Sequence, residues 1–317
     1  MNPDQQMSMP ANQITGLSLQ QEAEQGRAEA QNRLGLMHSS GQGAPKDYQQ
    51  AVTWFRSAAH SGYADAQNNL GLMFANGRGI PRDSQKAVFW FSKAAEQGYS
   101  RAQYNLALMY DTGQGVRQDY RKAFSLYSEA AEQGHARAQG NLGQLYHYGN
   151  GIGQDFAQAM SWYRLAAGQD HAKAQFQIGI LYEEGQGVEC DLSQAVIWYR
   201  KAARRGHSDA QFYLGLLCDA GKGMPQDYQQ AMAWYRKAAE SGHARAQLNL
   251  GLMLSNGHGT PADLAFAHKW LSLAENNGIA KASRYMKTVE SPVTQDDRPT
   301  GKIAFPQRNT ATASVAR

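Results

Sequence analysis

The sequence predicts an all-α fold of stacked helix-turn-helix repeats, and three recurring features support that prediction. The pair Ala-Gln returns every 36 residues, from 30–31 to 246–247. Gly-x-Gly follows each pair at a fixed distance, first at 41–43 and last at 257–259. A fixed period of this length is the signature of a repeat architecture, and it gives seven full repeats. All six Trp residues share one column of the repeat: Trp54, Trp90, Trp162, Trp198, Trp234 and Trp270.

Each repeat is expected to begin with a helix, which we call helix A. In the sixth repeat it covers residues 208–220, SDAQFYLGLLCDA. Ala210, Leu214 and Leu217 recur at helical spacing and give this segment an apolar face. Gly221 is expected to end it, because glycine accepts the left-handed conformation that commonly closes a helix.

A second helix, helix B, is expected after an approach that Pro225 stiffens. Asp227 is expected to cap it, because a carboxylate accepts a hydrogen bond from a free backbone N–H of the first turn. Gln230, three residues later, completes a capping-box pattern, in which its side chain bonds back to the N–H of the cap residue. Gly242 is expected to end the helix. Its apolar face consists of Ala231, Trp234, Tyr235, Ala238 and Ala239.

A glycine recurs inside helix A, where it costs up to about 1 kcal/mol in helix propensity relative to alanine. Gly215 is the glycine of the sixth repeat, and the third repeat has Ala107 there instead. Because this loss of helix propensity recurs in almost every repeat, the glycine must provide a compensating stabilisation. We therefore expect helix B to approach helix A closely at this position. The other members of this column are Gly35, Gly71, Gly143, Gly179 and Gly251.

These units resemble Sel1-like repeats, which are relatives of the tetratricopeptide repeat. The resemblance rests on the Leu-Gly pair, the Gly-x-Gly pair, the Asp-Tyr pair and the Trp-Tyr-x-x-Ala-Ala motif occurring together. The sequence departs from the pattern at Asp170, where a glycine is usual, at Phe266 and at Leu271. The resemblance implies a right-handed α-solenoid with a concave, partner-binding face. Its seven repeats are 28–63, 64–99, 100–135, 136–171, 172–207, 208–243 and 244–279.

A half repeat is expected to cap each end of the array, so that the solenoid spans residues 17–289. The first half repeat is the end of a helix B. The second, at 280–289, is a helix A that has Lys287 where the glycine would be, since no further helix B has to approach. Residues 1–16 and 290–317 lack the periodicity and are expected to be disordered.

Composition indicates a folded chain and argues against several functions. Hydrophobic residues make up 42% and charged residues 18% of the 317 residues, which is enough apolar material for a core. No apolar run approaches the roughly 18 residues of a membrane helix, and the N-terminal residues do not read as a secretory signal. The net charge of +4 is mild and spread along the chain, so we expect no nucleic-acid partner.

No catalytic or metal-binding constellation is found in the sequence. Equivalent positions in stacked repeats lie about 8–10 Å apart, whereas a metal needs ligands within about 2.1 Å. The Gly-x-Gly pairs are interpreted as turns, because no strand precedes them and no Lys-Ser/Thr follows. We therefore predict no enzymatic activity, no metal and no cofactor. Four histidines at the 36-residue spacing are interpreted as polar turn residues between repeats: His135, His171, His207 and His243.

The two cysteines, Cys190 and Cys218, lie in adjacent repeats and are expected to be free thiols. Free thiols favour a reducing compartment, so we expect a cytoplasmic location. Some cysteine-rich members of the family that the chain resembles are linked to β-lactam binding or hydrolysis. Those relatives pair their cysteines at short spacing within one repeat, and this chain also lacks Ser-x-x-Lys. A β-lactam-directed enzyme is therefore disfavoured.

The resemblance places helix A on the concave face, and three columns of helix A are expected to point into the groove. The column two residues before the leucine of Leu-Gly holds the aromatic side chains Tyr104, Phe176 and Phe212. The column five residues before that leucine holds a basic row: Arg101, Arg137 and Lys173. A mainly acidic row flanks the other side: Asp111, His147, Glu183 and Asp219.

We hypothesise that the groove of repeats three to six binds an extended peptide or a partner helix, with aromatic anchors and charged rims. The alternative is that the rings pack between repeats and that the charges form a solvated face. The predicted function is a non-enzymatic protein-interaction scaffold or adaptor. A second possibility is an exported bacterial effector or host-interaction protein that uses the same surface.

Overall fold

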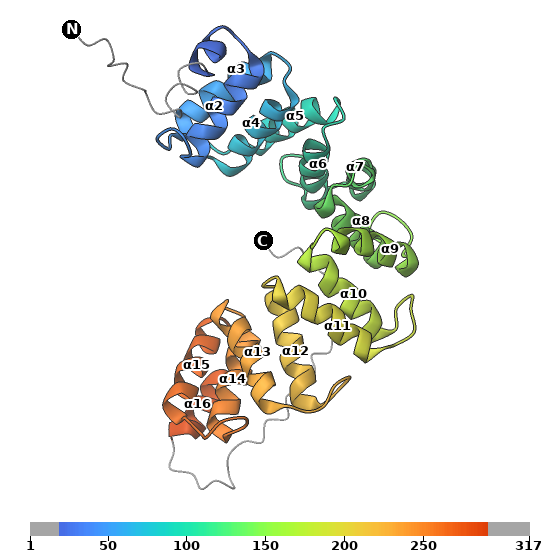
Figure 1. The fold of residues 1–317 in the computed structure, drawn as a ribbon, viewed down its shortest axis with the longest axis vertical. Coiled ribbons are helices and arrows are strands. Elements are labelled where there is room, and N and C mark those ends of the chain that lie inside the picture. The colour runs from blue at the N-terminus through green and yellow to red at the C-terminus, as the bar shows by residue number, and fades with distance from the viewer. Residues whose placement is uncertain (1–18, 291–317) are drawn as a thin grey trace, which may run out of the picture. The chain divides into compact units, whose positions relative to one another are not determined.

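The computed structural model describes residues 19–290, and every regular element in that range is a helix. Figure 1 shows helices α2 to α16 following one another along the chain. The segments predicted to be disordered, 1–16 and 290–317, lie outside the described residues, except for Glu290, which ends α16. The predicted all-α fold is confirmed.

Each of the seven repeats contains two helices, as the sequence predicts. Residues 19–24 form a helix before the first repeat, and α16 (Ala282–Glu290) follows the seventh. The helices A are α2 (Ala28–Ser40), α4 (Ala64–Asn76), α6 (Ser100–Thr112), α8 (Ala136–Tyr148), α10 (Ala172–Glu184), α12 (Ser208–Ala220) and α14 (Ala244–Asn256). The helices B are α3 (Tyr48–His60), α5 (Ser84–Ala95), α7 (Tyr120–Glu132), α9 (Phe156–Gly168), α11 (Leu192–Arg204), α13 (Tyr228–Glu240) and α15 (Leu264–Asn276).

The described residues divide into two compact units. The N-terminal unit contains the residues up to 145 together with 149–153, and the C-terminal unit contains 146–148 and the residues from 154 onward. From α2 to α7 in the N-terminal unit, and from α9 to α16 in the C-terminal unit, each helix packs against the next one along the chain. Helices α4, α5 and α6 show this in the N-terminal unit, and helices α12, α13 and α14 show it in the C-terminal unit.

Aspartate and glycine set the helix boundaries where the sequence predicts them. The Asp227 carboxylate accepts a hydrogen bond of 2.9 Å from the backbone N–H of Gln230, and Gly221 ends helix A with φ +63°. The predicted capping box is wrong, because the N–H of Asp227 donates instead to the carbonyl of Cys218 at 2.9 Å. Carbonyls in the last turn of a helix lack intrahelical donors, and this bond satisfies one of them.

Glycines inside helix A make room for a side chain of helix B, which confirms the predicted close approach. A Cβ atom on Gly215 would lie 2.5 Å from Cδ1 of Tyr235, whose ring is completely buried. In the seventh repeat, Gly251 faces Leu271, and a Cβ atom there would lie 2.8 Å from Cγ of the leucine. The close approach therefore joins the two helices of one repeat.

In repeats two to seven, the second glycine of Gly-x-Gly lies against the preceding repeat. A Cβ atom on Gly79 would lie 2.3 Å from the carbonyl oxygen of Tyr48, in the first turn of the preceding helix B. On Gly115 it would lie 2.4 Å from the carbonyl oxygen of Ser84. Both glycines also have φ near +70°, which L-residues rarely adopt. These glycines are turn residues, as predicted, and they are also contact points between repeats.

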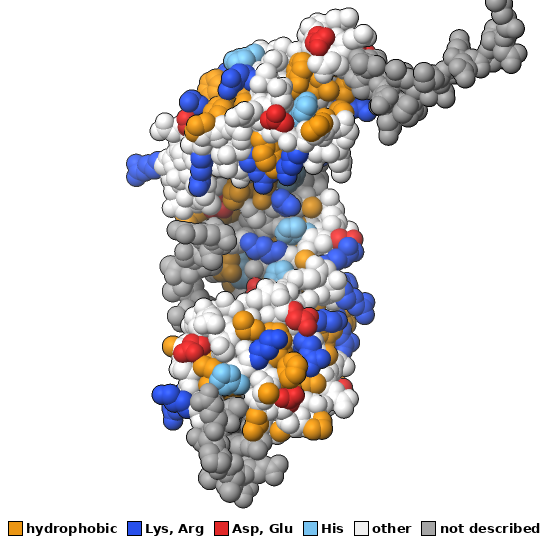
Figure 2. Space-filling view, turned by 90° about the vertical axis from the view of Figure 1, so that its left-hand side faces the viewer, with side chains coloured by type: hydrophobic (Ala, Val, Ile, Leu, Met, Phe, Trp, Pro, Cys, Tyr) orange, Lys and Arg blue, Asp and Glu red, His pale blue; other side chains and the backbone are white. Residues whose placement is uncertain are grey.

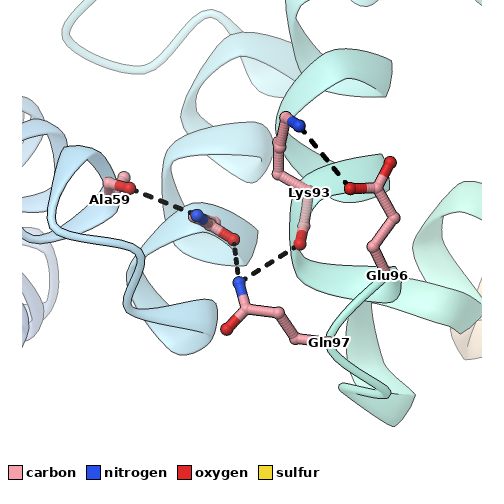
Figure 3. A network of polar contacts seen from close by, with 5 residues as sticks. Ala59, Lys93, Glu96 and Gln97 are labelled. Carbon is pink, nitrogen blue, oxygen red and sulfur yellow. Dashed lines mark hydrogen bonds and ion pairs between the residues drawn. The ribbon is translucent and has the colours of Figure 1, made fainter.

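The glutamine of the Ala-Gln pair binds the end of the preceding helix B. Gln67 Nε2 donates to the carbonyl of Ala59 at 3.2 Å, and Gln97 Nε2 donates in turn to Gln67 Oε1 at 2.7 Å (Figure 3). The carbonyl of Ala59 also accepts a hydrogen bond of 3.1 Å from the backbone N–H of Gly62, so the glutamine provides a second donor at this helix end. The same side chain-to-carbonyl bond is made by Gln31, Gln139, Gln175, Gln211 and Gln247.

Two departures from the repeat pattern are accommodated locally. Asp170 adopts φ +61°, in the left-handed region where the equivalent glycines lie, and its carboxylate forms an ion pair with Arg205. Aspartate is one of the few L-residues that enters this region at modest cost. Phe266, on the exposed side of α15, leaves 54% of its surface accessible.

Candidate functional site

The aromatic column predicted to line the groove is stacked on the histidines between repeats. Phe176 and Phe212 are only 7% and 3% exposed. These two rings therefore pack between repeats, which was the alternative to a role as binding anchors. Tyr104 is half-buried and keeps part of its ring at the surface. Ring centroids are 4.5–4.7 Å apart in three stacked pairs: Tyr104–His135, Phe176–His207 and Phe212–His243.

The histidines between repeats are N-caps of helix A, a more specific role than the turn residues that the sequence indicated. Nδ1 of His135 accepts a hydrogen bond of 3.2 Å from the backbone N–H of Ala138. A ring nitrogen that accepts carries no proton, so the proton of the neutral ring lies on Nε2. The same cap is made by His171, His207 and His243.

Burial holds the pKa of two of these caps below the ordinary value of 6.5. For His135, the nearby charges of Arg137 and Arg101 lower the pKa further. For His207, Asp209 opposes the effect of burial and Lys173 adds to it. In both repeats the neutral ring is the favoured form, and this is the form that the cap requires.

We expect the free energy of unfolding to fall as the pH drops below about 6.5. These histidines then bind protons more readily in the unfolded chain than in the folded chain, where their pKa is lower. Protonation would also remove the cap and place a positive charge at a helix N-terminus. His207→Asn keeps a capping side chain but does not titrate. Between pH 7.5 and 5.5, roughly one unit on either side of 6.5, the urea midpoint of the variant should fall less than that of the wild type. Equal falls would contradict this role.

The mainly acidic row lies against the tyrosines of helix B. The hydroxyl of Tyr127 donates to Asp111 Oδ2 at 3.2 Å, and the hydroxyl of Tyr199 donates to Glu183. Both tyrosine side chains are completely buried, so their hydroxyl groups need an acceptor inside the protein. These two carboxylates therefore link helix A to helix B of the same repeat.

The other two members of the acidic row also lie close to buried rings. Burial raises the pKa of Asp219, and burial, together with the charge of Asp219, raises the pKa of Tyr235. His147 is buried, and its ring centroid is 5.5 Å from that of Phe156 and 6.2 Å from that of Tyr163. The row that was predicted as a groove rim therefore has a structural role along most of its length.

Three of the predicted residues meet in one open pocket of the N-terminal unit. Arg101, Tyr104 and Arg137 line a pocket of about 410 Å³ together with His135. Both arginines are exposed, and neither forms an ion pair with an acidic side chain among residues 19–290. Three asparagines that were not among the predicted binding residues complete the wall: Asn68, Asn69 and Asn105.

Side-chain amides connect successive helices A next to this pocket. Asn69 Nδ2 donates to Asn32 Oδ1 at 2.9 Å, and Asn105 Nδ2 donates to Asn68 Oδ1 at 2.7 Å. Each amide nitrogen carries two N–H donors, so Asn105 needs only one of them for this bond. The sequence pattern that could have predicted these bonds is the recurrence of asparagine in two adjacent columns of helix A: Asn32 and Asn68 share one column, and Asn69 and Asn105 share the next.

The C-terminal unit has another open pocket, of about 730 Å³, whose lining includes Tyr182, Glu189 and Cys190 but none of the residues predicted to bind a partner. Figure 2 shows basic, acidic and apolar side chains interspersed on the face that it presents. Among residues 19–290, no group of three or more His, Cys, Asp or Glu side chains could hold a metal ion. Helices in this part of the chain are too short or too polar to cross a membrane. Cys190 is exposed, Cys218 is buried, and both are free thiols.

Comparison with solved structures finds two relatives that are each 35% identical to this chain. One is c5321, a protective antigen present in uropathogenic Escherichia coli strains and displaying an SLR fold, with a TM-score of 0.78. The match covers 88% of this chain and 60% of c5321, so the chain spans about three fifths of that protein's length. The other is a Sel1 repeat protein from Oxalobacter formigenes, with a TM-score of 0.75 and coverage of 89% and 83%.

More distant proteins share the fold alone. Yeast Tom70 is 13% identical, with a TM-score of 0.52 over 88% of this chain and 58% of its own. Among curated proteins, none gives a significant match. The profile of the Sel1 repeat matches all seven units that the sequence analysis delimited, from 28–63 to 244–279. The chain therefore belongs to the Sel1 repeat family, whose members are typically protein-interaction scaffolds.

Proposed function

We propose that this chain is a non-enzymatic interaction scaffold that binds a polypeptide partner, an extended segment or a helix, on its helix-A face. The pocket around Tyr104 is the observation that carries the proposal. Here, two exposed arginines and a half-buried ring, all predicted as partner-binding from the sequence, lie together on one surface. Aromatic and arginine side chains are the types that contribute most to binding at protein interfaces.

The helix-A face is well suited to recognition because its side chains are already held in place. Asn105 is bonded to Asn68 of the preceding repeat, and Tyr104 is stacked on His135, which caps the next helix. A surface that is ordered before binding loses less conformational entropy when the partner docks. In the C-terminal unit, Lys173 is the exposed member of the basic column, and Phe176 lies buried in the aromatic column.

Affinity capture from native lysate tests the proposal. The bait is the full chain, and the test variant is Arg101→Glu/Arg137→Glu. The matched control is Arg56→Glu/Arg121→Glu, which makes the same charge change at exposed positions on helices B of the same unit. We expect a partner that the wild type and the control retain and that the test variant loses. The same set of captured proteins from all three baits would contradict the proposal.

A host-interaction protein that uses the same face is a second candidate function. It is supported by the 35% identity to c5321, which is described as a protective antigen of uropathogenic Escherichia coli. A cytoplasmic adaptor would stay inside intact cells, whereas an exported effector would be found in the medium. Detection of the chain in the cell-free medium, with a cytoplasmic marker retained in the cells, would favour the second candidate over the first.

A further inference from the structure

We propose that the pocket lined by Arg101, Tyr104, Asn105, His135 and Arg137, here called the donor pocket, binds a carboxylate of an acidic peptide segment. The inference rests on the proposed function and names the chemistry of the partner at that face. It follows from the hydrogen-bonding groups that line the pocket, from their charge, and from a comparison between equivalent positions of the chain itself.

The polar groups of the donor pocket are mainly hydrogen-bond donors. Each arginine presents five N–H groups and no acceptor, and Asn105 has an N–H beyond the one it gives to Asn68. Nδ1 of His135 already accepts from the N–H of Ala138, so the ring carries its proton on Nε2 and can donate from there. A ligand that supplies acceptors is therefore the complementary one.

The charge of the donor pocket points to an anion. Arg101 and Arg137 both act on the ring of His135, where their positive charges add to the effect of burial in lowering its pKa. Asp65 and Asp111 are the nearby acidic groups: Asp65 acts on Tyr99, and Asp111 accepts a hydrogen bond from the hydroxyl of Tyr127. Neither arginine forms an ion pair among the described residues. A carboxylate between two guanidinium groups would relieve their mutual repulsion and accept paired hydrogen bonds.

The C-terminal unit shows that a carboxylate fits beside the capping histidine. At the repeat six–seven junction, Asp209 occupies the column that Arg101 occupies in repeat three, and its Oδ1 lies 3.3 Å from Nε2 of His243. His243 caps helix A and stacks on an aromatic ring, as His135 does. The chain supplies its own carboxylate at that junction, whereas an arginine takes the place at the donor pocket. We infer that the partner supplies the missing group.

Size and surroundings favour a peptide over a polyanion such as nucleic acid. A pocket of about 410 Å³ holds one or two side chains, and Leu72 offers apolar contact beside the arginines. Nucleic acid requires an extended basic surface, but the net charge of +4 is spread along the chain and basic groups are interspersed with acidic ones. An extended segment or a helix that carries Glu or Asp meets these conditions.

Fluorescence anisotropy with labelled eight-residue peptides on the full chain tests the inference, at about 50 mM salt so that exposed charges are not strongly screened. The probe alternates Glu and Ala, a second peptide has Gln in place of Glu, and a third has phosphoserine. We expect saturable binding of the Glu peptide and at least tenfold weaker binding of the Gln peptide. Arg101→Asp copies the arrangement at Asp209, so the variant should fold and should bind the Glu peptide at least tenfold more weakly. Arg56→Asp, an exposed helix-B control, should leave the affinity unchanged.

Three results would overturn the inference. The first is no saturable Glu-peptide binding up to about 1 mM, the weak end of specific affinity. The second is an equal loss for Arg101→Asp and Arg56→Asp, which would indicate unspecific attraction. The third is binding of the phosphoserine peptide alone, which would assign the pocket to phosphate. If any of these is found while the captured partner is still lost from Arg101→Glu/Arg137→Glu, the scaffold proposal stands and only the carboxylate assignment fails.

Discussion

Gly79→Ala is expected to lower the free energy of unfolding of the N-terminal unit by about 2–5 kcal/mol, although it adds a single methyl group. Two costs combine at this position. The left-handed backbone, with φ +68°, costs an L-residue roughly 1–2 kcal/mol. The new Cβ atom would also lie 2.3 Å from the carbonyl oxygen of Tyr48, and forcing atoms into a packed site costs about 1–3 kcal/mol.

Gly98→Ala is the matched control, since it separates the two costs. Gly98 also has a left-handed backbone, with φ +77°, but a Cβ atom added there would meet no neighbouring atom within 4 Å. Its substitution should therefore cost only the backbone term of roughly 1–2 kcal/mol. Urea midpoints of the two variants and the wild type give the comparison. Equal losses for Gly79→Ala and Gly98→Ala would show that the loop does not touch the preceding repeat as described.

Gly215→Val is expected to separate helix A from helix B in the sixth repeat. The nearest atoms to a Cβ at this position are Cδ1 and Cε1 of Tyr235, both at 2.5 Å, and the tyrosine is completely buried. Overpacking of this kind costs about 1–3 kcal/mol. The effect should appear as a lower urea midpoint and as faster hydrogen exchange in α12 and α13.

Gly215→Ala provides the control for this prediction. The third repeat already carries Ala107 at the same position, opposite the buried ring of Tyr127. A repeat can therefore adjust to one methyl group, and alanine regains up to about 1 kcal/mol of helix propensity. We expect the alanine variant to lose much less stability than the valine variant. Equal losses for the two variants would contradict the steric role of this column.

The boundaries of the repeats and helices could be predicted because the residues that set them act locally. Asp227 caps the helix that begins at the next residue in the sequence. Gly221 ends a helix because the glycine itself adopts the left-handed backbone conformation. The failed capping box marks the limit of this reasoning. The N–H of Asp227 had a better acceptor in Cys218, a residue of the preceding helix that only the folded repeat brings near.

The candidate site could be predicted only as a set of columns. Tyr104 and Phe212 occupy the same column, yet one keeps an accessible edge and the other is buried between repeats. Likewise, Arg101 and Asp209 share a column, but only the structure shows that Asp209 lies against His243. The burial and the partners of these side chains depend on residues about one repeat away in the sequence. The type of residue in a column therefore does not determine them.

Site-specific photo-cross-linking with the captured partner tests the central claim, that recognition occurs on the helix-A face. A photoreactive residue is placed either at Leu72, which lines the donor pocket, or at Arg56, which is exposed on helix B of the first repeat. We expect the partner to be cross-linked from position 72 and not from position 56. Cross-linking from position 56 alone, or with equal yield from both positions, would contradict it.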